Sequence, residues 1–268
     1  MIALTAFGLA VRVDGSGAPL VLVHSGVTDH TSWDGVAAVL AGSYTVIRYD
    51  LRGFGASPRP TTGFRHLDDL VMVLEHVGVG PAVMVGNSFG GKLALDLAAT
   101  SPHLVRAVAM LAAPIAGWDW SADVRAYGDA EEAALEAGDL DDAVRLNMDM
   151  WVRGPVREWS PPLRALAAVV EPSMRTALAN QTTVDELELD DERRTGAERL
   201  GDIRMPVLVG VGDQDVPDYV TIAEHLVAGI AGAEYVEFPG AGHLIPVEQP
   251  QAVATCLTGF LAGLGPPQ

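Results

Sequence analysis

The residues best suited to chemistry are a serine in the first half of the chain and an aspartate and a histidine near its end. Ser88 lies within the pentapeptide GNSFG at 86–90, whereas Asp215 and His243 each follow a short apolar run. A serine hydroxyl is a poor nucleophile near neutral pH. It needs a base within hydrogen-bonding reach, and that base needs an orienting carboxylate. We therefore expect Ser88 to be the nucleophile, His243 the base and Asp215 the acid.

The segment around Ser88 has the form of a nucleophile elbow. A short β-branched run over 81–85 predicts a buried strand, and the leucines and alanines after Ser88 predict a buried helix. The chain must turn sharply at the serine, so side chains at Gly86 and Gly90 would collide with their surroundings. The helix would begin at the serine and point its free N–H groups toward a developing oxyanion.

The oxyanion hole needs two N–H donors. Phe89, directly after the nucleophile, supplies one through its backbone. We expect the other from the loop after His24, with Gly26 as the first choice and Val27 as the alternative. The side chain of His24 would brace this loop by hydrogen bonding.

Three acids follow the strand predicted at 205–212, so the acid of the triad has rivals. We prefer Asp215 because it lies beyond the strand end. Asp213 is the serious alternative, and Asp218, before a helix, is expected to cap that helix or to interact with its dipole. Seven histidines compete for the role of base. His243 stands in a glycine-rich loop after the acid, which is why we choose it.

The rest of the chain alternates predicted strands and helices. The strands are nearly continuous in apolar residues, which is typical of a parallel sheet covered on both faces, and ligands bind such sheets at the carboxyl ends of the strands. Strands are predicted at 20–23, 44–49, 81–85, 105–111, 205–212 and 234–238, and helices at 33–40, 64–77, 217–226 and 249–264.

The pattern changes over 115–204. This segment has no convincing strand, and its many alanines, leucines and acids predict several helices. We expect residues 1–114 and 205–268 to form an α/β core and 115–204 to form a helical cap, inserted between two late strands, over the site. Side chains that could contact the substrate are His30 in the loop after His24, and Trp118, Trp151 and Trp159 in the cap.

With these residues in place, the chain resembles the α/β-hydrolase superfamily along nearly its whole length. Ser25 departs from the glycine that this family commonly has after the loop histidine. The segments that carry the resemblance are HSG at 24–26, YDLRGFGAS at 49–57, GNSFGG at 86–91, GDQD at 212–215 and GAGH at 240–243.

The resemblance implies a serine hydrolase that cleaves a carboxylic ester or lactone of a small to medium, largely apolar substrate, without a metal or organic cofactor. Members that open epoxides or remove halides use an aspartate at the elbow, where this chain has Ser88. One alternative is a carbon–carbon hydrolase of a ring-cleavage product, since the GNSFGG elbow resembles that subfamily. Another is a ligand sensor with slow turnover that signals through its cap.

Composition limits the partners. The chain has 35 acidic and 17 basic residues and a net charge of −18, which excludes a nucleic-acid-binding surface and disfavours anionic membranes. The single Cys256 excludes an internal disulfide or a cysteine metal site. The N-terminus has no basic region of a signal peptide, and no apolar run approaches the roughly 20 residues of a membrane span. We expect a cytoplasmic monomer or homodimer that acts on a small molecule.

Overall fold

An eight-stranded sheet forms the centre of the molecule. The computed structural model describes residues 3–189 and 196–265, and its strands follow the spatial order β1-β2-β4-β3-β5-β6-β7-β8. The strands are β1 (Ala3–Leu4), β2 (Ala10–Asp14), β3 (Ala18–Val23), β4 (Tyr44–Tyr49), β5 (Ala82–Asn87), β6 (Val105–Leu111), β7 (Val207–Gly212) and β8 (Glu234–Phe238).

The sheet is parallel from β4 through β8, whereas β2 pairs antiparallel with β1 and β4. The strands β5 and β7 are buried along their whole length, as their apolar sequences predict. The predicted strands 44–49, 105–111 and 234–238 match β4, β6 and β8. β5 runs two residues further than predicted, so that the buried Asn87 still belongs to the strand and Ser88 follows its last residue.

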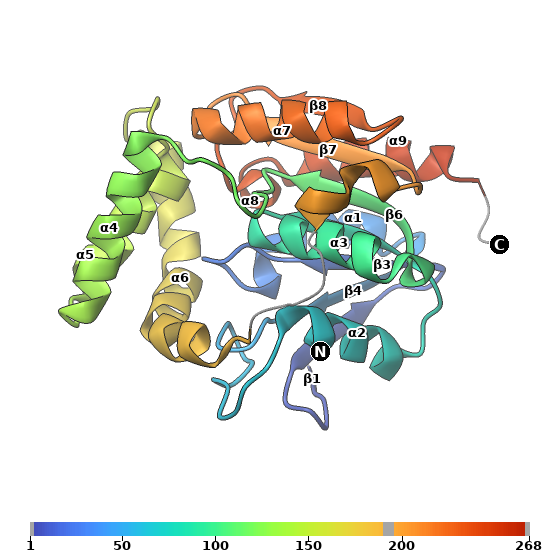
Figure 1. The fold of residues 1–268 in the computed structure, drawn as a ribbon, viewed down its shortest axis with the longest axis horizontal. Helices are drawn as coiled ribbons and strands as arrows, with labels where there is room; N and C mark the ends of the chain where they lie inside the picture. The colour runs from blue at the N-terminus through green and yellow to red at the C-terminus, as the bar shows by residue number, and fades with distance from the viewer. Residues whose placement is uncertain (1–2, 190–195, 266–268) are drawn as a thin grey trace.

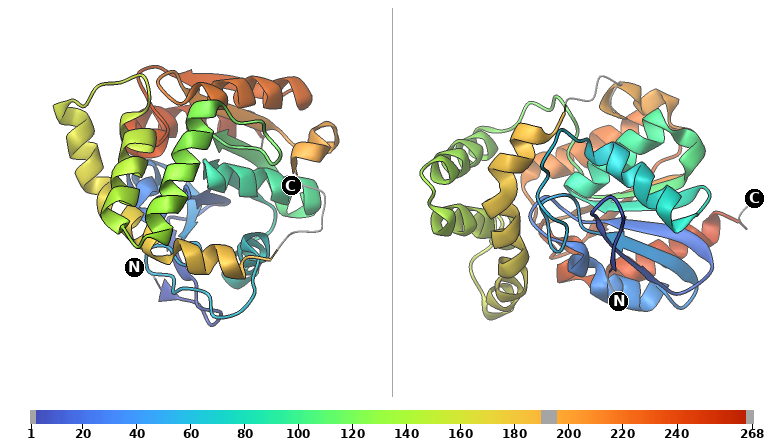
Figure 2. Two further views of the ribbon diagram at one scale, coloured as in Figure 1. Left: turned by 60° about the vertical axis from the view of Figure 1, so that its left-hand side comes forward. Right: turned by 90° about the horizontal axis from the view of Figure 1, so that it is seen from below.

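Helices cover both faces of the sheet, as the alternating pattern predicts (Figure 2). On one face α1 packs against α9, and on the other α3 packs against α2 and β5. The core helices are α1 (Asp34–Leu40), α2 (His66–Val77), α3 (Phe89–Thr100), α7 (Pro217–Gly229), α8 (Ile245–Glu248) and α9 (Pro250–Gly263), and short 3₁₀ helices are η1 (His30–Trp33) and η2 (Pro102–Leu104).

A helical insertion between β6 and β7 forms the cap. Figure 1 shows α4, α5 and α6 standing together at one side of the sheet. The insertion contains α4 (Ala122–Glu136), α5 (Leu140–Asn147), a π-helical segment η3 (Met148–Arg153) and α6 (Pro161–Leu187). Its own small core includes Val144, Met148, Val170, Met174 and Leu178.

The last part of the predicted cap packs on the α/β core. The 3₁₀ helix η4 (Gly196–Asp202) contacts α3, and the Gly196 N–H donates to Asp96 Oδ1 at 2.7 Å. Leu200 belongs to the main core cluster. None of the helices in the described part of the chain is long and apolar enough to cross a membrane.

Candidate active site

The structure brings Ser88, His243 and Asp215 together in one hydrogen-bonded chain. Ser88 Oγ lies 2.8 Å from His243 Nε2, and His243 Nδ1 lies 3.1 and 3.0 Å from the two carboxylate oxygens of Asp215. All three side chains are buried. Because Asp215 is a hydrogen-bond acceptor in its ionised form, Nδ1 carries the proton and Nε2 is left to accept the proton of the serine hydroxyl.

Ser88 occupies the strained backbone position that a nucleophile elbow requires. Its φ is 52° and its ψ is −121°, between the end of β5 and the first residue of α3. A Cβ on Gly86 would lie 2.1 Å from the Gly90 carbonyl, and a Cβ on Gly90 would lie 2.3 Å from the carbonyl oxygen of Val23. Only glycine at these two positions therefore allows α3 to begin so close to the sheet.

Two backbone amides beside Ser88 are available for an oxyanion. Gly26 and Phe89 line the same cavity as Ser88, and within the described chain neither of their N–H groups makes a backbone hydrogen bond. The Val27 N–H instead donates to Ser25 Oγ at 3.4 Å. This contact favours Gly26 over Val27 as the second donor, and it uses the serine that departs from the family pattern.

His24 fixes the loop that carries Gly26. The Leu51 N–H donates to His24 Nε2 at 3.0 Å, so His24 Nδ1 carries the proton and donates to the Ser25 carbonyl at 2.7 Å. Burial lowers the pKa of His24, which keeps the ring neutral. The side chain therefore braces the loop, as predicted.

The two other candidates for the acid, Asp213 and Asp218, accept hydrogen bonds from backbone amides elsewhere. Asp213 Oδ1 accepts a hydrogen bond from the Gly240 N–H at 2.6 Å, which holds the loop before His243. Asp218 Oδ1 accepts from the Ser121 N–H at 2.8 Å and so ties the start of the cap to α7. The sequence predicted that Asp218 caps the following helix or interacts with its dipole, and Asp218 does lie in the first turn of α7, where it makes this contact in addition.

An ion pair between the cap and the core supports the His243 loop. Arg157 Nη1 lies 2.6 Å from Glu248 Oε2, and both side chains are largely buried. Glu248 Oε1 also accepts from the Gly242 N–H at 3.0 Å, and Arg157 donates to the carbonyl of Gly240 at 3.3 Å. The residues next to His243 are thus fixed by both partners of the pair.

Two aromatic rings pack against the imidazole of His243. The ring centroid of Tyr219 lies 4.4 Å from that of His243, and the centroid of Trp151 lies 4.6 Å from it. Burial, with the nearby charge of Asp215, raises the pKa of Tyr219, although a hydrogen bond with Ser88 opposes this shift. The Tyr219 hydroxyl therefore stays neutral.

A cavity of about 300 Å³ lies between the cap and the triad. Its wall is partly apolar and partly polar, and three carboxylates face it. The lining residues are Gly26, Val27, Phe54, His66, Ser88, Phe89, Tyr127, Glu131, Asn147, Trp151, Ala177, Gln181, Val184, Asp185, Glu188 and His243.

A polar network in the cap holds Trp151 in this cavity. The Trp151 Nε1–H donates to the Tyr127 hydroxyl at 2.9 Å, and that hydroxyl lies 2.9 Å from Glu131 Oε1 and 2.8 Å from Asn147 Oδ1. Asn147 Nδ2 donates to Glu131 Oε1 at 2.5 Å. Trp151 lies in the π-helical segment η3, and such segments occur frequently at functional sites.

The other predicted substrate contacts lie outside the cavity lining. Trp118 packs against His225 at 5.9 Å between ring centroids. The Trp159 Nε1–H donates to Asp149 Oδ1 at 3.0 Å, and its ring packs on the core of the cap. Both indoles therefore stabilise the protein structure around the site, and Trp151 is the one of the three that faces Ser88.

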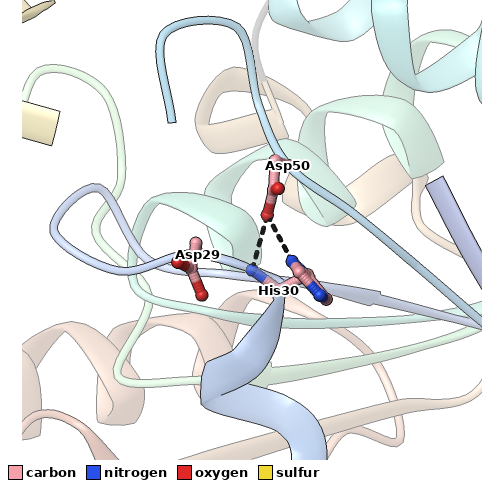
Figure 3. Close-up of side chains that lie close together, drawn as sticks. All are labelled: Asp29, His30 and Asp50. Carbon is pink, nitrogen blue, oxygen red and sulfur yellow. Dashed lines mark hydrogen bonds and ion pairs between the residues drawn. The ribbon is translucent and has the colours of Figure 1, made fainter. Parts of the chain in front are cut away.

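His30 is held by Asp50 and does not line the cavity. Asp50 Oδ1 lies 2.8 Å from both the backbone nitrogen and the Nδ1 of His30 (Figure 3). With Asp29, these residues place three potential metal-ligand atoms within 4.8 Å of one another. However, Asp50 Oδ2 accepts from the Ala56 N–H and Asp29 Oδ1 accepts from Thr31, so hydrogen bonds account for these carboxylates. The group joins the loop after β3 to the loop after β4.

Sequence reasoning missed several residues of the site. Tyr219, which packs against His243, had a usable signal, because it follows Asp215 by one turn on the helix after the acid loop. His66 begins α2, and its place in an amphipathic pattern gave no sign that it faces the site. Tyr127, Glu131 and Asn147 come from two cap helices whose packing determines their direction.

Comparisons with known proteins show what this chain is similar to. A family model described as "Alpha/beta hydrolase family" matches residues 20–255. The 2-hydroxymuconate semialdehyde hydrolase of Pseudomonas sp. (strain CF600) is 39% identical over 104 residues, which are 36% of this chain and 37% of that protein. The match thus spans little more than a third of that relative's length.

Two further likenesses extend over almost the whole chain. The 2-hydroxy-6-oxo-2,4-heptadienoate hydrolase of Pseudomonas putida (strain F1) is 27% identical over 258 residues, which are 92% of this chain and 90% of that protein. The solved structure of the esterase RhEst1 from Rhodococcus sp. ECU1013 is 25% identical with a TM-score of 0.78, and the alignment covers 99% of each chain.

Proposed function

Because the chain belongs to the α/β hydrolase family, we propose that it is a serine hydrolase that cleaves a carboxylic ester or a lactone through an acyl-enzyme on Ser88. The observation that carries the proposal is the 2.8 Å contact between Ser88 Oγ and His243 Nε2, at an elbow beside two amides that make no backbone hydrogen bond within the described residues. A nucleophile, a base and an oxyanion hole are the parts that acyl transfer requires.

The reaction follows from the positions of these groups. His243 takes the proton of the Ser88 hydroxyl as the oxygen attacks the carbonyl carbon, and the Asp215 carboxylate stabilises the resulting imidazolium. The N–H groups of Gly26 and Phe89 stabilise the oxyanion. The tetrahedral intermediate collapses, His243 gives its proton to the leaving alcohol, and a water molecule activated by the same imidazole then releases the acid.

The cavity supports an ester or lactone over a ring-cleavage product. The two relatives reported above are named for substrates that are carboxylic acids, a muconate derivative and a heptadienoate. A protein that binds a carboxylate usually provides a cation for it. Here the described lining residues include three carboxylates and neither lysine nor arginine. The carboxylate of a ring-cleavage product would be repelled by these three side chains. A simple ester or lactone has no such carboxylate.

The proposal is tested with alkyl esters of graded acyl length and simple lactones, using the wild type and Ser88→Ala under multiple-turnover conditions. We expect steady hydrolysis by the wild type, and no hydrolysis or labelling by an active-site phosphonate in Ser88→Ala. Turnover of a vinylogous 1,5-diketone in place of the esters would establish the carbon–carbon alternative. A single turnover followed by arrest would favour the sensor.

A further inference from the structure

We infer that the substrate of this protein carries a protonated amine, which binds to Asp185 and Glu188 at the mouth of the cavity. This inference deepens the proposed function and rests on it, since the amine would belong to the acyl or the alcohol part of the ester. The two carboxylates line the same cavity as Ser88, and a third, Glu131, faces it from the cap helix α4.

The position of the two carboxylates in α6 is unfavourable without a cation. Asp185 lies in the last turn of α6, Glu188 is its C-cap residue, and this turn contains no basic residue. The carbonyl end of a helix carries a partial negative charge, so acidic side chains are destabilising there. Sites that break a local rule of this kind are expected to be functional. A bound ammonium would be attracted by both carboxylates and by the helix end.

His66 is an independent sign that a polar ligand binds here. Its side chain is 98% buried and lines the cavity. Burial lowers the pKa of His66 to about 3, so the ring is neutral. Its Nε2 lies 4.0 Å from Glu188 Oε2, and within the described residues its Nδ1 has no hydrogen-bond partner. With the proton on Nδ1, Nε2 and Glu188 Oε2 are two acceptors 4.0 Å apart, and one ammonium group on a ligand can donate to both.

The charged side chains around the mouth leave the neutralisation of Asp185 and Glu188 to a ligand. Burial raises the pKa of Asp185 and of Glu188, and the nearby Lys92 opposes the shift at Glu188. The Lys92 ammonium, however, lies 2.7 Å from Asp96, with which it forms an ion pair. Gln181 forms a hydrogen bond with Asp185, but among the described residues no ion pair joins a lysine or arginine to Asp185 or Glu188, so both carboxylates can bind a cation that enters the cavity.

Matched esters test the inference directly. Methyl 6-(dimethylamino)hexanoate and methyl 7-methyloctanoate differ in the replacement of a protonated nitrogen by a CH group, and monomethyl adipate carries a carboxylate instead. 3-(Dimethylamino)propyl butanoate and 4-methylpentyl butanoate form the corresponding pair with the amine on the alcohol. We expect kcat/KM at pH 7 to be at least about tenfold higher for the amine in one of these pairs, and lowest for the adipate. The preference should fall as salt is raised from 0.05 to 0.5 M, because ions screen charges at an exposed mouth.

Variants locate the binding group. The double substitution Asp185→Asn with Glu188→Gln keeps the shape of the mouth and removes both charges, so the ratio of kcat/KM for the amine to kcat/KM for its neutral partner should fall to about one. Glu186→Gln, a neighbouring exposed acid outside the cavity lining, is the control and should keep the preference.

The outcomes separate this inference from the proposed function. Hydrolysis of all esters with equal kcat/KM would overturn the amine specificity and leave the serine hydrolase intact. A preference that survives the double substitution would overturn the assignment to Asp185 and Glu188. Absence of Ser88-dependent hydrolysis from every ester would overturn the proposed function itself, and the amine inference with it.

Discussion

Trp151 lies over His243, with 4.6 Å between the two ring centroids, and this contact joins the cap to the proposed catalytic base. The indole is held from behind by its hydrogen bond to Tyr127. Aromatic rings in contact pack in preferred arrangements, so the indole restricts the orientation of the imidazole. We therefore expect the cap to influence the proposed reaction as well as to enclose the substrate.

Substitutions of Trp151 should separate these roles. Trp151→Phe keeps an aromatic face and loses the bond to Tyr127, so kcat should fall by less than about tenfold, whereas Trp151→Ala should lower it by about 10–100-fold. Steady-state kinetics across pH 5–9 measures both. Trp159→Phe, whose indole faces away from the cavity, is the control. Equal kcat values for Trp151→Ala and the wild type would show that the ring contact has no catalytic effect.

The two acids after β7 should differ in their effect on kcat. Asp215→Asn removes the carboxylate that holds the tautomer of His243, and kcat should fall by a factor on the order of 10³ to 10⁴. Asp213→Asn keeps an oxygen that can accept from the Gly240 N–H, so its kcat should stay within about tenfold of the wild type. If kinetics of the two variants show the reverse ranking, the acid of the triad is Asp213.

The strained backbone at Ser88 should be measurable as stability. Both Ser88→Gly and Ser88→Ala remove the hydroxyl, but only glycine relieves a φ of 52°. The glycine variant should be more stable than the alanine variant by about 1 kcal/mol in denaturant unfolding. An alanine variant of equal or greater stability would show that the elbow stores no strain.

The pair formed by His30 and Asp50 should make stability depend on pH. Burial opposes the charge on His30, but the hydrogen bond and the charge of Asp50 outweigh it, and the pKa of His30 is raised. His30 in turn keeps the pKa of Asp50 below its ordinary 3.8, although burial raises it. The contribution of this pair to the free energy of unfolding is therefore complete between pH 3.8 and pH 6.5, the ordinary pKa values of the two groups. It is lost as pH rises through the folded pKa of His30.

Urea unfolding from pH 6 to pH 9 measures this contribution. The free energy of unfolding of the wild type should decrease more over this range than that of His30→Gln, because glutamine does not titrate. His103→Gln, at an exposed position after α3, is the matched control and should behave as the wild type does. Parallel curves for the wild type and His30→Gln would contradict the assignment.

The ion pair between Arg157 and Glu248 should be needed for both stability and activity. Arg157→Met leaves the Glu248 carboxylate buried without its partner, which should cost about 2–4 kcal/mol of unfolding free energy. Because Glu248 also holds the Gly242 amide, kcat should fall as well. Arg164→Met, on the surface of the cap, serves as the control, and a variant at Arg157 with unchanged kcat would show that the His243 loop keeps its position without the pair.

Local patterns predicted the centre of this fold because β5, β6 and β7 are nearly continuous apolar runs and are buried. The predicted limits of β4, β6 and β8 agree with the structure, although β8 is exposed along most of its length. The order of Ser88, Asp215 and His243 along parallel strands predicted their meeting, since strand ends in such a sheet share one edge. The conformation of Ser88 followed from the glycines at 86 and 90.

The cavity wall could not be predicted in the same way. Glu188 reaches the site because the end of α6 pairs with Phe64, a contact between segments far apart in the chain. Trp118, Trp151 and Trp159 look alike in the sequence, and only helix packing directs one of them toward Ser88. The charged mouth likewise depends on which side of α6 faces the core, which the sequence pattern does not show.

The attachment of the cap at several points determines how molecules enter and leave. The Phe64 N–H donates to the Leu187 carbonyl at 3.1 Å, and the Leu189 N–H donates to the Phe64 carbonyl at 2.8 Å. On the opposite side Asp218 holds the Ser121 amide, and Arg157 holds Glu248. Because the cap is held to the core on both sides, we expect it to keep its position over Ser88. The cavity of about 300 Å³ beneath it should then limit the size of the molecules that reach the serine.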